Sequence, residues 1–261
     1  MKRDLYFSKP LMNAAGLLGF SPDKREFEGF GAFVTNPISL RPRAPAAQPA
    51  VFEFPGGFLL HSGLPNPGLA AALKKHAASW SRAALPIIVH LMAERPDETA
   101  SMLRTLEDIE NVMAVEIGFP PFQPDDLILS NLELCAAELP LIFSLPAEQI
   151  LRLGPRLIEG GAAALGMARP RGALMRGGRL VKGRLYGRSL FPQALNLVRE
   201  AAALGLPLIA AGGVWNRQDA ADMLSAGAMA VQIDASLWLP PEEAPAWDLS
   251  AARSSSSSSS R

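Results

Sequence analysis

Two stretches near the end of the chain decide the fold: LPLIAAGGV (residues 206–214) and AGAMAVQID (residues 226–234). Each contains a continuous apolar run of strand length, which is typical of parallel strands buried on both faces. Between them, the apolar residues of 217–225 recur at helical spacing. A strand, a helix and a second strand in this order predict a βαβ unit in a parallel sheet.

The same alternation continues back to the N-terminus. Eight strands in a chain of 261 residues favour a closed (β/α)₈ barrel, the TIM barrel, over an open doubly wound sheet, which more often has five or six strands. The predicted strands are 11–14, 32–35, 87–91, 114–117, 141–145, 163–166, 208–211 and 230–233, and the predicted helices are 24–30, 69–82, 97–109, 127–138, 148–158, 192–204 and 217–225.

The barrel is expected to occupy residues 1–240 as a single domain. Residues 241–261 are expected to form a short extension, because the serine run at 254–260 cannot bury a core, and the last helix of the barrel is predicted to be shortened. Two long connections, 36–67 and 169–191, follow the second and sixth strands. They lie at the face where barrel enzymes build their sites, and we expect β-hairpins within them.

The composition argues against several classes of protein. The 25 basic side chains balance 25 acidic ones, so the chain lacks the basic surface that attracts nucleic acid or anionic lipid. A single cysteine excludes an internal disulfide and a cysteine-rich zinc site, and we expect no metal centre. No run of about 18 apolar residues occurs, so we expect a cytoplasmic protein without a membrane span.

Gly212 and Gly213 follow the seventh strand, where barrels commonly bind phosphate through backbone N–H groups. The alternative interpretation is a tight turn from strand to helix. His90 ends the third strand and is a candidate acid, base or substrate contact, or else a structural histidine. Cys135 lies among apolar residues of a predicted helix, which favours a buried side chain over a nucleophile.

Several motifs together resemble the flavin-dependent dihydroorotate dehydrogenases. They are PLMNAAG (10–16), GAFVT (31–35) with RPR (41–43), FPGG (54–57) and GLPNPG (63–68), of which the last is the most specific. The resemblance implies an FMN-binding barrel that acts on a small-molecule substrate. It assigns substrate binding to Asn66, and it assigns cofactor binding to Ala14, Ala15, Gly16, Gly187, Gly212, Gly213 and Ala235.

The chain departs from that family where the chemistry takes place. The family has a cysteine or serine base after the fourth strand, and here Pro121 stands at that position and cannot take a proton. Asn36 and Ser144 replace two lysines that stabilise negative charge on the flavin and substrate. Leu60 and Gly118 replace two asparagines that hold the substrate. Dihydroorotate is therefore not the expected substrate.

The expected phosphate site also carries a conflicting charge. Asp234-Ala235 replaces the glycine and threonine that follow the eighth strand in the family, and a carboxylate repels phosphate. Arg169, Arg184 or Arg188 offers compensation, although all three also suit a solvated loop. Asp234 alternatively caps a helix.

Three functions follow from the sequence. The first is an FMN-dependent oxidoreductase with a substrate other than dihydroorotate. The second is a non-catalytic barrel that serves as a binding or scaffold subunit. The third is a dihydroorotate dehydrogenase with an unusual base such as His90. Because the shortened end of the chain would leave apolar surface uncovered, we expect a homo-oligomer or a partner subunit.

Overall fold

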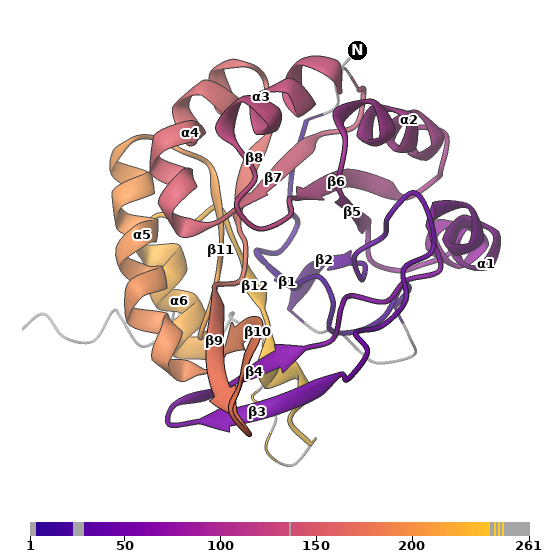
Figure 1. The fold of residues 1–261 in the computed structure, drawn as a ribbon. Helices are drawn as coiled ribbons and strands as arrows, with labels where there is room; N and C mark the ends of the chain where they lie inside the picture. The colour runs from indigo at the N-terminus through magenta and orange to yellow at the C-terminus, as the bar shows by residue number, and fades with distance from the viewer. Residues whose placement is uncertain are drawn as a thin grey trace, which may run out of the picture.

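A computed structural model describes residues 4–22, 29–135, 137–240, 243, 245 and 247. Eight parallel strands form a closed barrel in the order β1-β12-β11-β8-β7-β6-β5-β2 (Figure 1). The barrel closes where Leu11 of β1 pairs with Val231 of β12. The predicted (β/α)₈ barrel is thereby confirmed. The strands are β1 (Leu11–Asn13), β2 (Phe30–Val34), β5 (Ile87–Met92), β6 (Val112–Gly118), β7 (Leu141–Leu145), β8 (Ala164–Met167), β11 (Leu208–Ala211) and β12 (Ala230–Ile233).

In the part of the chain that the structure describes, six α-helices follow one another around the outside of the barrel (Figure 1). The helix predicted at 217–225 has those bounds in the structure. Asn216 and Asp219 form a capping box at its N-terminus. The helix predicted at 24–30 is wrong at its end, because Phe30 pairs with Leu11 as the first residue of β2. Residues 23–28 lie outside the described residues. The helices are α1 (Leu69–Ser81), α2 (Pro96–Leu106), α3 (Asp125–Leu134), α4 (Ala147–Glu159), α5 (Phe191–Ala203) and α6 (Arg217–Ser225).

The core has two layers, as the continuous apolar strands require. Inside the barrel, Met12, Val34, Ile88, Ile142 and Ile209 pack with alanines from the neighbouring strands. Outside it, the opposite faces of the strands pack against the helices in a larger buried cluster. Each buried aliphatic side chain contributes about 1.5–3 kcal/mol to folding.

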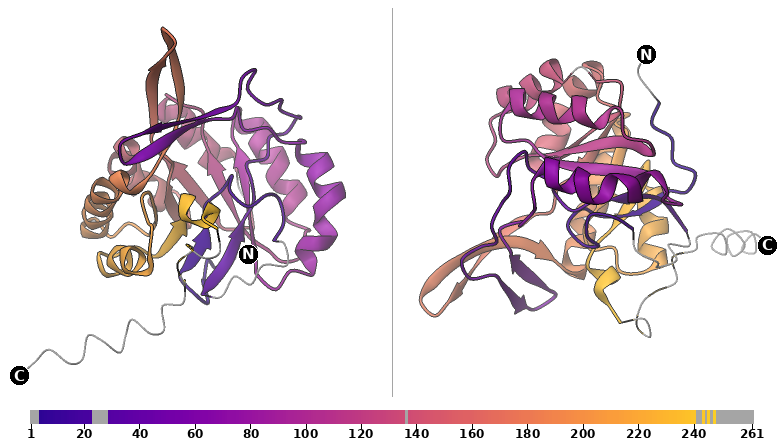
Figure 2. Two further views of the ribbon diagram at one scale, coloured as in Figure 1. Left: turned by 90° about the horizontal axis from the view of Figure 1, so that it is seen from below. Right: turned by 90° about the vertical axis from the view of Figure 1, so that its right-hand side faces the viewer.

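The two long connections each contain a β-hairpin, as predicted, and the two hairpins join into one sheet. The first hairpin is β3 (Ala50–Phe54) with β4 (Gly57–His61), and the second is β9 (Arg171–Arg176) with β10 (Arg179–Tyr186). The strand order is β3-β4-β10-β9, and Arg184 of β10 pairs with Leu60 of β4. The β9–β10 hairpin projects away from the barrel, with the β3–β4 hairpin beside its base (Figure 2).

Two short 3₁₀ helices complete the described structure: η1 (Arg188–Leu190) precedes α5, and η2 (Ala235–Trp238) follows β12. Over the described residues, η2 follows β12, at the place where a complete barrel has its eighth helix. The predicted shortening of that helix depends on residues after 240 and stays a prediction. The expected extension at 241–261 lies almost wholly outside the described residues. None of the helices in the described ranges is long and apolar enough to cross a membrane.

Candidate functional site

A cavity of about 600 Å³ opens at the C-terminal ends of the barrel strands. Its walls come from the segments that follow β5, β6, β7 and β8, with side chains added by β9, β10 and β12. This is the face where (β/α)₈ proteins hold small molecules. The polar or charged side chains that face it include Arg43, His90, Glu94, Glu116, Asp125, Ser144, Glu148, Gln149, Arg152, Arg169, Arg171, Arg184 and Gln232.

Three buried polar side chains form the floor of this cavity. Nδ1 of His90 lies 3.1 Å from Oε1 of Glu116, and Nε2 of Gln232 donates to Oε2 of Glu116 at 2.7 Å. Burial acts to raise the pKa of Glu116, but the contacts with His90 and Gln232 and the charge of Arg169 outweigh it and hold the pKa below its ordinary value. Glu116 is therefore an ionised carboxylate that orients both neighbours.

Gly118 makes room for the imidazole of His90. A Cβ atom at position 118 would lie 2.5 Å from Nε2 of His90, closer than any real contact. The resembling family has an asparagine at position 118, and the histidine ring takes that space here. The two changes are coupled, so restoring an asparagine at 118 alone would push His90 out of place.

Three arginines line the same cavity, and we call Arg169, Arg171 and Arg184 the arginine cluster. Arg171 and Arg184 are directly opposite each other in the β9–β10 pair. The guanidinium of Arg169 lies 5.2 Å from the ring centre of Tyr186, and its Nε and Nη2 are buried without a hydrogen-bond partner. Burial lowers the pKa of Arg184 to about 10, with the charges of Arg169, Arg171 and Arg43 adding to the effect.

The glycine half of the barrel mouth, by which we mean Gly187, Gly212, Gly213 and Ala235, already holds an acidic side chain of the protein itself. The carboxylate of Asp234 is buried, and its Oδ1 accepts a hydrogen bond from the backbone N–H of Ala235 at 2.6 Å. Burial raises the pKa of Asp234, while the charge of Arg169 and the backbone N–H groups of Ala235 and Gly213 oppose the rise. Asp234 is thus the N-cap of η2, as one interpretation of the sequence proposed.

Aromatic side chains fill the space next to this carboxylate. Tyr186 is 2% exposed, and its ring stacks on Phe58 at 5.1 Å and lies 5.6 Å from the ring of Trp238. Ala14 and Ala235 belong to the same buried cluster. Gly187 is locked against the first hairpin, because a Cβ there would lie 2.2 Å from the carbonyl oxygen of Gly56. This region is packed protein interior.

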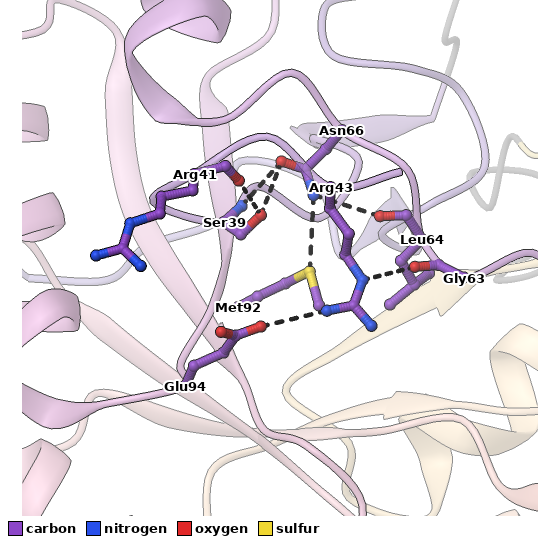
Figure 3. A network of polar contacts seen from close by, with 8 residues as sticks. All are labelled: Ser39, Arg41, Arg43, Gly63, Leu64, Asn66, Met92 and Glu94. Atoms are coloured by element: carbon purple, nitrogen blue, oxygen red, sulfur yellow. Dashed lines mark hydrogen bonds and ion pairs between the residues drawn. The ribbon is translucent and has the colours of Figure 1, made fainter. Parts of the chain in front are cut away.

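Asn66 holds the long loop after β2 together (Figure 3). Its Oδ1 accepts hydrogen bonds from the backbone N–H groups of Ser39 and Gly68 and from the Ser39 hydroxyl, at 3.0–3.1 Å. Its Nδ2 donates to the carbonyl oxygen of Leu64 at 3.3 Å. Beside it, Arg43 bonds to the carbonyl oxygen of Gly63 and to Glu94, which fixes the loop against the cavity rim (Figure 3).

The structure separates the residues that the sequence analysis grouped. Ala15, His90 and Pro121 face the large cavity, and Gly212 faces a smaller neighbouring pocket of about 60 Å³. Ala14, Gly16, Gly187, Gly213, Ala235 and Asn66 line neither of these two cavities. Cys135 is buried as predicted, and burial raises the pKa of its thiol to about 11, which removes it as a nucleophile.

Sequence reasoning did not find Arg171, nor the link between Glu116 and His90. A signal for Arg171 was present, because Arg169 and Arg171 alternate at the spacing of one strand face. The contact between Glu116 and Gln232 joins residues 116 positions apart, and it becomes visible only once the barrel closes.

A closed (β/α)₈ barrel with a side-chain-lined cavity at its C-terminal mouth defines a class of small-molecule-binding barrels. The family model for dihydroorotate dehydrogenase matches residues 3–129. The catalytic subunit of dihydroorotate dehydrogenase B (NAD(+)) from Trichlorobacter lovleyi is 30% identical over 92% of this chain and 87% of its own. This chain therefore belongs to the dihydroorotate dehydrogenase family.

Further comparisons agree. The corresponding catalytic subunit from Pelobacter propionicus is 29% identical over 91% of this chain and 86% of its own. The crystal structure of DHODH from Eimeria tenella in complex with ferulenol superposes with a TM-score of 0.69 at 18% identity, covering 88% of this chain and 76% of that one, which supports the fold. A second family model, nitronate monooxygenase, matches residues 175–259, the part that contains the whole glycine half.

Proposed function

We propose that this chain is a member of the dihydroorotate dehydrogenase family that does not oxidise dihydroorotate and that serves as a small-molecule-binding or scaffold subunit without flavin chemistry. The observation that carries the proposal is the carboxylate of Asp234, which is buried in the glycine half and bonded to the N–H of Ala235. A cofactor phosphate would need that same N–H group.

FMN, which the family resemblance implies, does not fit the residues present. A phosphate bound at Gly213 and Ala235 would compete with the buried carboxyl group of Asp234 for the N–H of Ala235, and it would be repelled whenever that group is ionised. The ring of Tyr186 packs in the same cluster as Ala14 and Ala235, so the contacts proposed for the cofactor are made by protein atoms. Asn36 supplies no charge to a flavin, and its Oδ1 accepts a hydrogen bond from Gly19 at 3.1 Å.

The substrate side supports the same proposal. Pro121 lies at the exposed rim of the cavity and has no group that can accept a proton. His90, the candidate base, is paired with Glu116 through Nδ1, which leaves Nε2 as the nitrogen that could take a proton, but that nitrogen packs against the backbone of Gly118. Asn66, proposed as a substrate contact, uses both Oδ1 and Nδ2 in hydrogen bonds to the backbone of its own loop.

A second candidate function is an FMN-dependent oxidoreductase with another substrate. It is favoured by the backbone of the glycine half, because Gly187, Gly212 and Gly213 all have the positive φ angles that let backbone N–H groups approach a ligand. Under this function, rotation of Asp234 and Tyr186 would have to free the site, at the cost of the contacts described above.

Flavin binding distinguishes the two functions. The protein is purified from a flavin-replete host, its visible absorbance is recorded, and FMN is titrated by calorimetry. We expect a colourless protein with no heat of binding, and stoichiometric flavin would overturn the proposal in favour of the oxidoreductase. In Asp234→Asn, which keeps the cap but removes the charge, we expect FMN affinity to rise, whereas Asp222→Asn on the surface of α6 should leave it unchanged.

We also propose that the barrel works with a second copy or a partner subunit. The two bacterial relatives are named catalytic subunits. The small sheet exposes Val51, Met175 and Leu180, each more than half accessible, at the hairpins that stand off the barrel (Figure 2). Exposed apolar residues on one small sheet suit an interface. A monomer in sedimentation at all accessible concentrations, with no partner recovered, would argue against this.

A further inference from the structure

The charges around the large cavity divide into paired and unpaired groups. Arg43 is paired with Glu94, and Arg152 with Asp125. Glu116 is satisfied by His90 and Gln232. Arg171 and Arg184 make no ion pair or side-chain hydrogen bond with any other described residue, and Arg169 has two buried N–H groups without partners. The surplus charge at the cavity wall is positive.

This arrangement destabilises the protein as it stands. Arg171 and Arg184 face each other across the β9–β10 pair, and like charges directly opposite on neighbouring strands repel. Arg184 is only partly exposed, and burial lowers its pKa to about 10, so water screens its charge poorly. Arg171 is exposed at the cavity wall, and partial burial of its guanidinium and the charge of Arg43 lower its pKa as well. A negatively charged group between them would remove both penalties.

A second pair of opposed arginines on the same hairpin lies outside the cavity and serves as a comparison. Arg176 and Arg179 are also directly opposite each other, at the turn end of β9 and β10. Both are exposed and neither lines the cavity, and Arg176 donates to the carbonyl oxygen of Glu53 at 2.9 Å. Solvent screens that pair, so it needs no ligand.

We propose that the large cavity binds a small organic anion with at least two negative charges, carboxylate or phosphate, through Arg169, Arg171 and Arg184. The inference goes beyond the proposed function, since it concerns what occupies the cavity whether or not the glycine half takes a flavin. Guanidinium groups suit such ligands because each presents two parallel N–H donors to two oxygens.

The cavity also limits the size and character of the ligand. Its volume of about 600 Å³ lies within the range of small-molecule sites, and the acidic side chains of Glu94 and Glu148 near the rim disfavour a long polyanion such as nucleic acid. Met92, Phe119 and Met167 line the cavity as well, so the ligand is expected to carry an apolar portion next to its charged end.

The test is a thermal unfolding series with citrate and inorganic pyrophosphate as probes, at constant ionic strength set with chloride. We expect at least one probe to raise the Tm saturably, and the one that does so identifies the carboxylate or phosphate class. Arg184→Met and Arg171→Met should each weaken binding by about 10–100-fold, and Arg179→Met should leave it unchanged. No saturable shift with either probe, or an equal shift in all variants, overturns the proposal.

The unliganded variants give an independent readout. Because Arg184→Met removes an unpaired, poorly solvated charge, we expect its Tm without ligand to rise by about 2–4 °C. If Arg184 stabilised the fold, its replacement by methionine would lower the Tm instead. A lower Tm or failure to fold in Arg184→Met, together with unweakened probe binding in Arg171→Met, would show that the cluster serves the fold and not a ligand.

Discussion

The glycine half and the arginine cluster lie on the same barrel mouth, yet the first is mostly filled, with a pocket of only about 60 Å³ beside Gly212, and the second is open. At the glycine half, Asp234, Tyr186 and Trp238 occupy the space beside the glycines with protein atoms. At the arginine cluster, three cations face a cavity of about 600 Å³, and among the described residues Arg171 and Arg184 make no ion pair while two N–H groups of Arg169 lack a hydrogen-bond partner. The same backbone motifs can surround different side chains, so the function of a family member must be argued from its site and not from its fold.

The largest expected effect concerns the rate of dihydroorotate oxidation, and fast oxidation would contradict the comparison of the two halves. We expect oxidation to be at least about 10²–10⁴-fold slower than in an enzyme with a cysteine or serine base, because Pro121 takes no proton. Pro121→Cys should not restore it, since Gly118 and Leu60 still fail to position the substrate. The measurement is anaerobic mixing of FMN-supplemented protein with dihydroorotate, and rapid flavin bleaching would contradict the expectation.

The hydrogen bonds of Glu116 at the floor of the large cavity should contribute several kcal/mol to the free energy of unfolding. Glu116→Leu strands the polar atoms of His90 and Gln232 in the barrel interior, and we expect a loss of about 3–5 kcal/mol in the free energy of unfolding. Urea denaturation measures it. Glu116→Gln is the matched control, because it keeps the shape and one hydrogen bond and should cost less. Equal stability of the leucine variant and the wild type would refute the role given to this carboxylate.

Packing around the glycine half can be tested by comparing two glycines of nearly equal φ, one in the glycine half and one in the exposed β9–β10 turn. Gly213 (φ 72°) lies against α5, and a Cβ there would be 2.4 Å from the backbone nitrogen of Phe191. Gly178 (φ 73°) in the β9–β10 turn has open space. We expect Gly178→Ala to cost about 1–2 kcal/mol for the left-handed backbone, and Gly213→Ala about 3 kcal/mol or more because packing is added. Similar losses in chemical denaturation would show that Gly213 is not tightly packed.

The smallest expected effect is a difference in pH dependence, on the order of 1 kcal/mol. The pKa of Glu116 is lowered in the folded state, so its stabilisation is present above the ordinary glutamate pKa and is lost as pH falls through the folded value. The pKa of Asp234 is raised, so stability is lost as pH rises through its range. Urea titrations from acid to neutral pH should show a flatter acid limb for Glu116→Gln and a gain near neutrality for Asp234→Asn. The same profile in both variants would contradict the assignment.

The sequence predicted the barrel because its evidence is local. Continuous apolar runs such as 206–214 mark buried parallel strands, and both hairpins were expected from the length of their connections. The prediction failed at Phe30, where a helical pattern runs into a strand and only pairing with Leu11 sets the boundary. The sequence could also predict that Cys135 is buried and that Asp234 caps a helix, because each feature depends on near neighbours in the chain.

What the sequence determined by itself is the fold, since it follows from residue type and spacing. The absence of the family's base at Pro121 stays a prediction from the resemblance. The tertiary structure alone decided which residues share a site. Glu116 meets Gln232 only across the closed barrel, Arg184 meets Arg171 only in the hairpin register, and Tyr186 reaches Phe58 and Trp238 only after two distant loops join. These contacts depend on long-range geometry, which no local pattern encodes, because hydrogen bonds and charges act over a few ångströms in space and not along the chain.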